Sequence, residues 1–173
     1  GSQVVVIDTN LPAESIAWLA DNCHAPIFAD PVSTVKAEKL RPVLGKLHTL
    51  KPNRLEAELL SGVPITGTDS LHRAAQTLLE TGLHRVFISL GADGVYAADQ
   101  SGSVTLPAPK AEMVSTTGCG DSFMAALTWA YLQGSDLERS ARAGLAASSL
   151  TMESAETIHP SMSEAELLRR MAL

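Results

Sequence analysis

The segment Ser115–Phe123 combines two glycines and an aspartate directly before an apolar stretch that predicts a helix. Glycines at the amino end of a helix allow backbone N–H groups to converge on an anion, and the helix dipole favours negative charge there. Asp121 would lie in the first turn, where a carboxylate can take a proton from a hydroxyl that attacks a phosphoryl group. A plain turn with a first-turn aspartate explains the same residues, so both interpretations stay open on this segment alone.

The elements that must position this segment alternate between strands and helices. Apolar runs predict strands at residues 4–8, 26–29, 47–50 and 85–90, and a hairpin at 95–98 and 104–106. Helical spacing predicts helices at 13–22, 35–44 (interrupted by a proline), 53–60 and 68–81, and then at about 118–132. Capping boxes at Ser135/Glu138 and Ser161/Glu164 predict two final helices, the first ending near residue 152. This order predicts a three-layer α/β/α fold with a mainly parallel sheet.

Composition narrows the classes of partner. The chain has 173 residues, 45% of them apolar and 18% charged, which suits one globular domain. Its net charge of −6 argues against a nucleic-acid partner and against a membrane surface, although backbone amides could still bind a phosphate. Cys23 and Cys119 are too few for a disulfide framework or a zinc cluster, so we expect a reducing, cytoplasmic compartment. No apolar run is long enough to predict a transmembrane helix.

Three segments share their motifs with one enzyme family. Ser115–Phe123 resembles the C-terminal motif of ribokinase-like (PfkB-type) carbohydrate kinases, usually Asp-Thr-Thr-Gly-Ala-Gly-Asp-Ala-Phe. Lys51–Glu58 is similar to the family's Asn-x-x-Glu motif, and Ser89–Gly94 to its Thr-Leu-Gly-x-x-Gly turn. The three occur in the family's order. The chain is therefore identified as a member of this family, and the resemblance implies a ribokinase-like fold that uses ATP and Mg²⁺.

The resemblance assigns catalytic roles to the last of these segments. Asp121 would be the base that activates the hydroxyl of the substrate. The backbone amides of Gly118, Cys119 and Gly120 would form the anion hole for the transferred phosphoryl group. Ser115 replaces an acid that helps to bind a monovalent cation in many members, so a need for such a cation stays open.

The resemblance also assigns residues to the nucleotide and to the metal. Asn53 and Glu56 would organise Mg²⁺ and the nucleotide phosphates, largely through water. A helix cap explains Asn53 equally well, and a solvated first-turn acid explains Glu56. Ser89, Gly91 and Gly94 would border the nucleotide.

Ala143, or its neighbour, stands where several family members have an asparagine near the adenine. The resemblance therefore assigns Ala143 to the nucleotide site, and we expect the asparagine contact to be absent there.

Residues after two of the predicted strands are assigned to the substrate. Asn10 ends the first predicted strand, at the edge where open α/β sheets bind ligands. Ser33 and Lys36 follow the second strand at the same edge and could contact phosphate or substrate, although a capped helix with a solvent lysine explains them too. These segments look most like those of pseudouridine kinases, while ribokinase-type, adenosine-type and ketosugar substrates stay open.

Much of the family's pattern is not recognisable in this sequence. The N-terminal half, its small β lid and its Gly-Gly-Asn motif have no counterpart here, so residues 1–173 are predicted to be the C-terminal, ATP-binding half. Such a half would have little kinase activity alone, which makes a non-catalytic nucleotide-binding module the main alternative. Homo-oligomers or pairing with the missing half are further expectations. A hydrolase with Cys119 as nucleophile, its pKa lowered by the helix end, is the remaining alternative, although no histidine follows at a suitable position.

Overall fold

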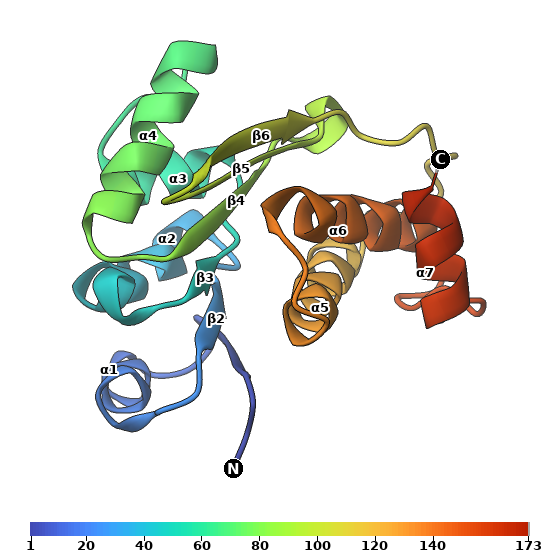
Figure 1. Cartoon of the computed structure of the whole chain (residues 1–173). Coiled ribbons are helices and arrows are strands. Elements are labelled where there is room, and N and C mark those ends of the chain that lie inside the picture. The colour runs from blue at the N-terminus through green and yellow to red at the C-terminus, as the bar shows by residue number, and fades with distance from the viewer. Residues whose placement is uncertain (173) are drawn as a thin grey trace. The chain divides into compact units, whose positions relative to one another are not determined.

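The computed structural model describes residues 1–172, which divide into two compact units (Figure 1). Unit 1 comprises Gly1–Leu90 and Tyr96–Val104. Unit 2 comprises Gly91–Val95 and the chain from Thr105 onward. None of the helices within residues 1–172 is both long and apolar enough to cross a membrane.

A six-stranded sheet runs in the order β1-β2-β3-β4-β5-β6. Its strands are β1 (Val5–Asp8), β2 (Ile27–Asp30), β3 (Thr49–Leu50), β4 (Arg85–Ser89), β5 (Val95–Asp99) and β6 (Gly102–Leu106). The pairs β1–β2, β2–β3 and β3–β4 are parallel, whereas the two-residue connection between β5 and β6 requires an antiparallel pair. The prediction of an α/β fold with a mainly parallel sheet is confirmed. The third strand, predicted over four residues, has only two.

The helices of unit 1 lie along one side of its sheet (Figure 1). They are α1 (Ala13–Asn22), α2 (Thr34–Ala37), the 3₁₀ helix η1 (Glu38–Lys46), α3 (Arg54–Ser61) and α4 (Thr68–Glu80). Strands paired in sequence order with right-handed crossovers place every connecting helix on the same face. The helix predicted at 35–44 is instead divided between α2 and η1. Pro42 lies inside η1. Proline lacks a backbone N–H and disfavours α geometry in the residue before it, so a continuous α-helix cannot run through this segment.

The core of unit 1 lies between the sheet and these helices. Fully buried aliphatic side chains come from helices and strands alike, among them Ile16, Leu40, Leu50, Leu78 and Ile88. Burial of such side chains is worth about 1.5–3 kcal/mol each before entropy is counted. This packing fixes the strand ends, so the loops that follow them start from a rigid base.

The described part of unit 2 contains three α-helices, α5 (Cys119–Leu132), α6 (Leu137–Met152) and α7 (Glu164–Met171), and the short 3₁₀ helix η2 (Gly91–Asp93). The first two pack very closely, because Gly144 of α6 lies against the ring of Phe123 of α5. A Cβ atom at Gly144 would come within 2.4 Å of Phe123 Cε1. A small-residue cluster fills the rest of the contact: Ala126, Ala130, Ala143, Ala146, Ala147 and Leu167.

The cap of α6 differs from the predicted one. Asp136, not Ser135, caps the helix, and its Oδ1 accepts the Arg139 N–H at 2.7 Å. The Ser135 N–H donates to the Ala130 carbonyl at 3.0 Å, so Ser135 belongs to the turn that ends α5. Its buried Oγ has no hydrogen-bond partner, which marks the predicted Ser135/Glu138 capping box as wrong.

The cap of α7 also lies later in the sequence than predicted, in this case by two residues. Ser163 caps the helix by accepting the Glu166 N–H at 3.3 Å. The Ser161 hydroxyl instead contacts His159 Nδ1 at 2.8 Å. Both errors arise because a second residue with a capping oxygen follows the first within two positions, and the turn before it decides which one is used.

Candidate functional site

The predicted site residues divide between the two units. Asn10, Lys36, Asn53, Glu56 and Ser89 belong to unit 1. The other seven belong to unit 2: Gly91, Gly94, Gly118, Cys119, Gly120, Asp121 and Ala143.

In unit 1, the carboxyl ends of β1 and β2 lie side by side, with Asp8 paired to Asp30 in the parallel register. Just beyond, Lys36 Nζ donates to Asn10 Oδ1 at 2.6 Å. Asn10 is held in turn by Asp8, whose carboxylate accepts the Asn10 N–H at 2.7 Å and its Nδ2–H at 3.2 Å. The two residues predicted to face the substrate are thus brought together as a polar pair.

The loop that carries Asn10 is held in place by buried contacts. The hydroxyl of Thr9, which is fully buried, donates to the Pro31 carbonyl and joins the loops after β1 and β2. Lys39 Nζ donates to the carbonyls of Thr9 and Leu11 at 2.8 and 3.0 Å. Because one lysine donates hydrogen bonds to two backbone carbonyls of this loop, Asn10 lies on a rigid support.

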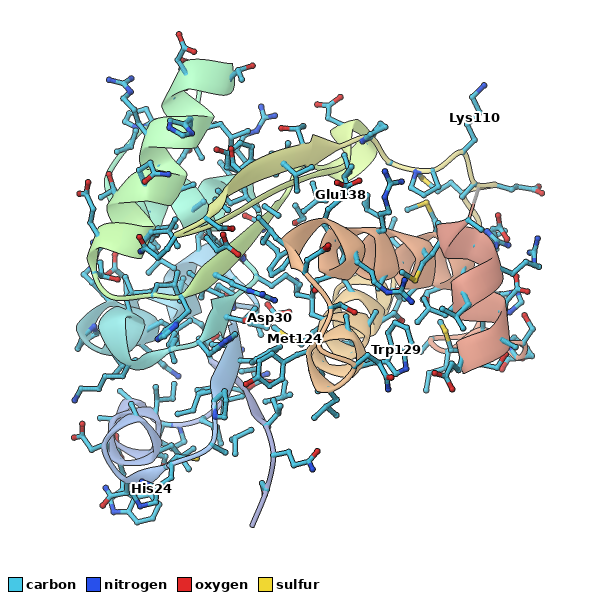
Figure 2. All side chains as sticks on the ribbon, in the orientation of Figure 1. His24, Asp30, Lys110, Met124, Trp129 and Glu138 are labelled. Atoms are coloured by element: carbon cyan, nitrogen blue, oxygen red, sulfur yellow. The ribbon has the colours of Figure 1, made fainter. Side chains whose placement is uncertain are left out.

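A buried group of charges lies beside this pair. Lys51 Nζ pairs with Asp30 Oδ2 at 2.9 Å, and the two side chains are only 8% and 17% exposed. Asp30 lies at the end of β2 (Figure 2). Burial raises the pKa of Glu56, the nearby Asp30 carboxylate raises it further, and the Asn53 N–H and the Lys51 ammonium oppose the shift. Two carboxylates with one ammonium leave net negative charge, which a cation would neutralise.

Asn53 and Glu56 form a complete capping box at the start of α3. Asn53 Oδ1 accepts the Glu56 N–H, and Glu56 Oε2 accepts the Asn53 N–H, each at 2.9 Å. Ser89 lies next to them, since its N–H donates to the Pro52 carbonyl at 2.9 Å and it forms a parallel bridge with Asn53. The structure therefore brings together Asn53, Glu56 and Ser89, as expected, and the cap accounts for one oxygen of each of the first two.

In unit 2, the loop before α5 has a left-handed backbone conformation at Gly118, the residue that precedes the helix. Gly118 has a φ of 83°, in the left-handed region, and a Cβ atom there would lie 2.5 Å from the Thr157 carbonyl oxygen. Asp121 lies exposed in the first turn of α5. First-turn N–H groups have no partner within their own helix and remain suited to an anion. The Cys119 N–H, however, makes a long bond of 3.3 Å to the Thr116 carbonyl, which an anion would have to replace.

The Cys119 thiol is not activated. It lies 3.6 Å from the Ser148 carbonyl oxygen and 3.9 Å from that of Ser115, half-buried at the start of α5. Burial raises its pKa, in part offset by the bond to Ser148, so the expectation that the helix end lowers this pKa is wrong. A thiolate at neutral pH is disfavoured, which removes the support for a cysteine hydrolase.

The glycine-rich turn of residues 91–94 also belongs to unit 2. Gly91 and Gly94 have φ values of 62° and 96°, and the Gly94 N–H donates to the Gly91 carbonyl at 3.1 Å. A Cβ atom at Gly94 would lie 2.0 Å from the Leu106 carbonyl oxygen, so only glycine fits. The turn therefore has a structural reason for both glycines, and their contact with a nucleotide remains a prediction.

Ala143 does not line a surface. It is completely buried in the small-residue cluster between α5, α6 and α7, where an adenine could not reach its side chain. Leu145, two residues further along α6, lines a cleft of about 540 Å³. The remaining lining comes from the loop after β6 and from α6 and α7: Leu106, Pro107, Ala108, Pro109, Lys110, Arg142, Ala146, Arg170 and Met171. The walls of this cleft are largely apolar, and two of its cations, Arg142 and Arg170, pair with Glu138 and Glu153. Residue spacing alone does not predict this cleft.

A second cleft of unit 2, of about 490 Å³, opens beside Asp121. Gly118, Asp121, Ala125 and Trp129 line it from one face of α5, and Met162 lines it from the loop before α7. Trp129 lies on this side of α5 (Figure 2), and its indole N–H donates to Glu164 Oε1 at 3.2 Å. The candidate base thus borders a largely apolar hollow.

Comparison with known sequences finds one family. A profile of the pfkB family carbohydrate kinases matches residues 8–165. Pseudouridine kinase of Escherichia coli (strain K12) is 39% identical over 169 residues, which are 96% of this chain and 54% of that protein. An uncharacterised sugar kinase of the same organism is 35% identical over 164 residues, 92% of this chain and 45% of that protein. The chain spans about half the length of the curated relatives it matches.

Comparison with solved structures agrees. A crystal structure of a candidate sugar kinase from Clostridium perfringens has a TM-score of 0.94 and 35% identity, over 99% of this chain and 54% of that one. Arabidopsis thaliana ribokinase, solved with ribose and ATP, has a TM-score of 0.83 and 24% identity, over 99% of this chain and 56% of that one. At that identity the second likeness shows the fold alone.

Proposed function

Because the chain belongs to the pfkB family of carbohydrate kinases, we propose that it supplies the ATP side of an enzyme that phosphorylates the 5′-hydroxyl of pseudouridine. The observation that carries the proposal is Asp121, exposed in the first turn of α5, three residues after the left-handed Gly118. A carboxylate and a set of helix N–H groups at one helix end are what a phosphoryl transfer needs. The substrate is taken from the relative with 39% identity.

The proposed reaction proceeds by direct transfer. Asp121 accepts the proton of the acceptor hydroxyl as that oxygen forms a bond to the γ-phosphorus of ATP. The bond from that phosphorus to the bridging oxygen breaks, and ADP leaves with the electron pair. The backbone N–H groups of Gly118, Cys119 and Gly120 stabilise the charge that develops on the transferred group.

The residues of unit 1 fit a role beside Mg²⁺. Magnesium prefers oxygen ligands and keeps several waters, so a site with few protein ligands suits it. Among residues 1–172 there is no group of three or more acidic, histidine or cysteine side chains that could hold a metal alone. We infer that Asn53 and Glu56 hold Mg²⁺ through water and through phosphate oxygens, with Asp30 adding negative charge. When bound, the ion would neutralise charge on the phosphates.

The other predicted residues keep the roles that the resemblance to the family implies. Ser89, Gly91 and Gly94 border the nucleotide, and we place the adenine in the cleft lined by Leu145 rather than at Ala143. The polar pair of Asn10 and Lys36 contacts the acceptor.

Ribose, adenosine and ketosugars remain alternative acceptors for the same chemistry. The cytoplasm remains the expected compartment, in keeping with two free cysteines.

The test is Asp121→Asn in the natural protein that contains this chain. We expect phosphorylation of pseudouridine to fall by about 10³-fold or more, since base catalysis and its positioning are lost, while ATP affinity changes little. Asp69→Asn is the matched control, because Asp69 is also an exposed first-turn aspartate, in α4. Full activity of the Asp121 variant would remove Asp121 as the base.

A non-catalytic nucleotide-binding module is the second candidate. It is favoured by one observation, namely that the Cys119 N–H already donates to the Thr116 carbonyl at 3.3 Å. A panel of pseudouridine, ribose, adenosine and fructose phosphates, assayed for ATP consumption with the natural protein, separates the two. Phosphorylation of none of them, with ATP still bound, would favour the module.

A further inference from the structure

Val32 is the one described non-glycine residue with a positive φ, at 63°. The Ser33 N–H donates to the Pro31 carbonyl at 2.7 Å, so Val32 is the central residue of a γ-turn of the rare type with positive φ. A β-branched side chain is especially unfavourable in this region, whereas glycine adopts it freely. A strained residue of this kind persists only where its surroundings hold it, and such residues gather at functional sites.

The surroundings of Val32 do hold it. On one side, the Val32 N–H donates to Asp30 Oδ1 at 2.9 Å, while Asp30 Oδ2 pairs with the buried Lys51. On the other side, Ser33 caps α2 by accepting the Lys36 N–H at 3.3 Å. Pro31 between them accepts the hydroxyl of Thr9. The turn is therefore anchored to a strand end, to a buried ion pair, to a helix start and to the neighbouring loop.

The strained turn exposes an apolar side chain at the edge of the sheet where unit 1 presents its polar pair. Val32 is 47% exposed. Its neighbour Pro31 bonds to Thr9, which precedes Asn10, and Ser33 caps the helix turn that carries Lys36. Polar and apolar groups thus lie within a few residues of each other on two joined loops. A nucleoside has the same two characters, since it combines ribose hydroxyls with a flat base.

This inference rests on the proposed function. We propose that Val32 is a specificity-determining residue that contacts the base of a nucleoside acceptor, while Asn10 and Lys36 contact the hydroxyls of its ribose. Glycine would relieve the strain, and nearly half of the Val32 surface is open to solvent, where a ligand can reach it. The presence of a β-branched residue instead is explained if its side chain meets a ligand. A free sugar lacks the base, so a contact with Val32 would add little to its binding.

The test compares Val32→Ala and Val32→Gly with Val35→Ala in the natural protein that contains this chain. Val35 is 86% exposed, three residues on in α2, and serves as the matched control. We expect both Val32 variants to raise KM for pseudouridine about tenfold, with KM for ATP and for ribose unchanged. We also expect Val32→Gly to unfold at a higher denaturant concentration than wild type, so misfolding does not confuse the result.

The outcomes separate the inference from the function on which it rests. If the wild type phosphorylates pseudouridine and Val32→Ala leaves its KM unchanged, the inference is overturned and the proposed function stands. The same holds if the KM values for ribose and pseudouridine rise together, because Val32 would then not select the base. If the wild type phosphorylates no acceptor, the proposed function fails and takes the inference with it.

Discussion

Glu56 combines a structural task with a charge that its surroundings disfavour. Its Oε2 caps α3 by accepting the Asn53 N–H, yet burial raises the pKa of its carboxyl. An acid whose pKa rises on folding costs stability as the pH increases from its unfolded pKa through its folded pKa. At neutral pH, therefore, the buried charge weakens the fold. A carboxyl that occupies this position despite the cost fits a role in binding a cation.

The corresponding variant is Glu56→Gln. Glutamine can still accept the Asn53 N–H, so the capping box persists while the charge is removed. We expect the free energy of unfolding at pH 7, measured by urea titration, to be equal to that of wild type or higher. Affinity for Mg·ATP, measured by calorimetry, should fall about tenfold or more. Glu58→Gln, in the same helix, is the control and should change neither quantity. If Glu56→Gln lowers the free energy of unfolding and leaves Mg·ATP affinity unchanged, Glu56 serves the fold alone.

Gly118 and Gly134 make a second matched pair at the residue scale. Both have positive φ, 83° and 69°, but a Cβ atom at Gly118 meets Thr157 while one at Gly134 meets nothing within 4 Å. Gly134→Ala should cost about 1 kcal/mol of unfolding free energy, from backbone conformation alone. Gly118→Ala should cost about 1–3 kcal/mol more and should also weaken ATP binding, because the loop must move. Equal costs would show that Thr157 yields freely.

These residues mark what the sequence can and cannot reveal at this scale. The aspartate and glycines of Ser115–Phe123 stand out by type and spacing, whereas the Asn-x-x-Glu pair is identified by its resemblance to a family motif. The strain at Val32 is not identified in either way, since valine predicts a strand and only the buried partners of Asp30 and Pro31 impose the turn. Likewise, the position of Leu145 in a cleft depends on which face of α6 packs inward.

At the scale of elements, two stacked histidines lie just before the first residues of β3 and β4. The ring of His48, just before β3, stacks on Phe28 at 5.4 Å between centroids and on His84, just before β4, at 5.2 Å. Burial, with help from the charges of His84 and Arg85, lowers the pKa of His48 from 6.5 to about 4. The neutral ring is therefore part of how the amino ends of two neighbouring strands pack.

This stack predicts an acid-sensitive fold. Because the folded pKa of His48 lies below 6.5, its contribution to stability is complete above pH 6.5 and is lost as the pH falls toward 4. The loss should be about 1–2 kcal/mol, a value reduced because the ring is partly exposed. His48→Gln should remove that part of the pH dependence in urea unfolding curves measured between these limits. An unchanged difference between wild type and variant across the range would contradict the assignment.

The elements themselves were largely predictable, and the exceptions have physical reasons. Apolar spacing predicts helices α1, α3, α4 and α5 because each buries one face, whereas the prediction of α6 rests on a capping box. β3 was overestimated, since its run of apolar residues continues into buried positions outside the two paired residues. The capping residues of α6 and α7 were missed because several neighbours carry suitable oxygens, and the preceding turn makes the choice.

At the scale of the whole molecule, the question is whether this chain can act alone. It spans 54% of pseudouridine kinase, and in unit 2 the candidate base Asp121 is exposed beside an open, apolar cleft. Phosphoryl transfer to a hydroxyl competes with transfer to water, and kinases suppress the latter by closing the site. A chain whose base is exposed to solvent lacks that protection.

We therefore expect the isolated 173-residue chain to bind Mg·ATP with little or no phosphorylation of pseudouridine. Calorimetry measures the binding, and a coupled assay for ADP with chromatography of the nucleoside measures the transfer. Asp121→Asn in the same chain is the control for any residual ADP release, because hydrolysis that does not use Asp121 would persist. Turnover at the rate of an intact kinase would show that unit 1 and unit 2 suffice. Binding without turnover would instead mean that the parts present supply the nucleotide chemistry, and that acceptor binding and exclusion of water need further protein.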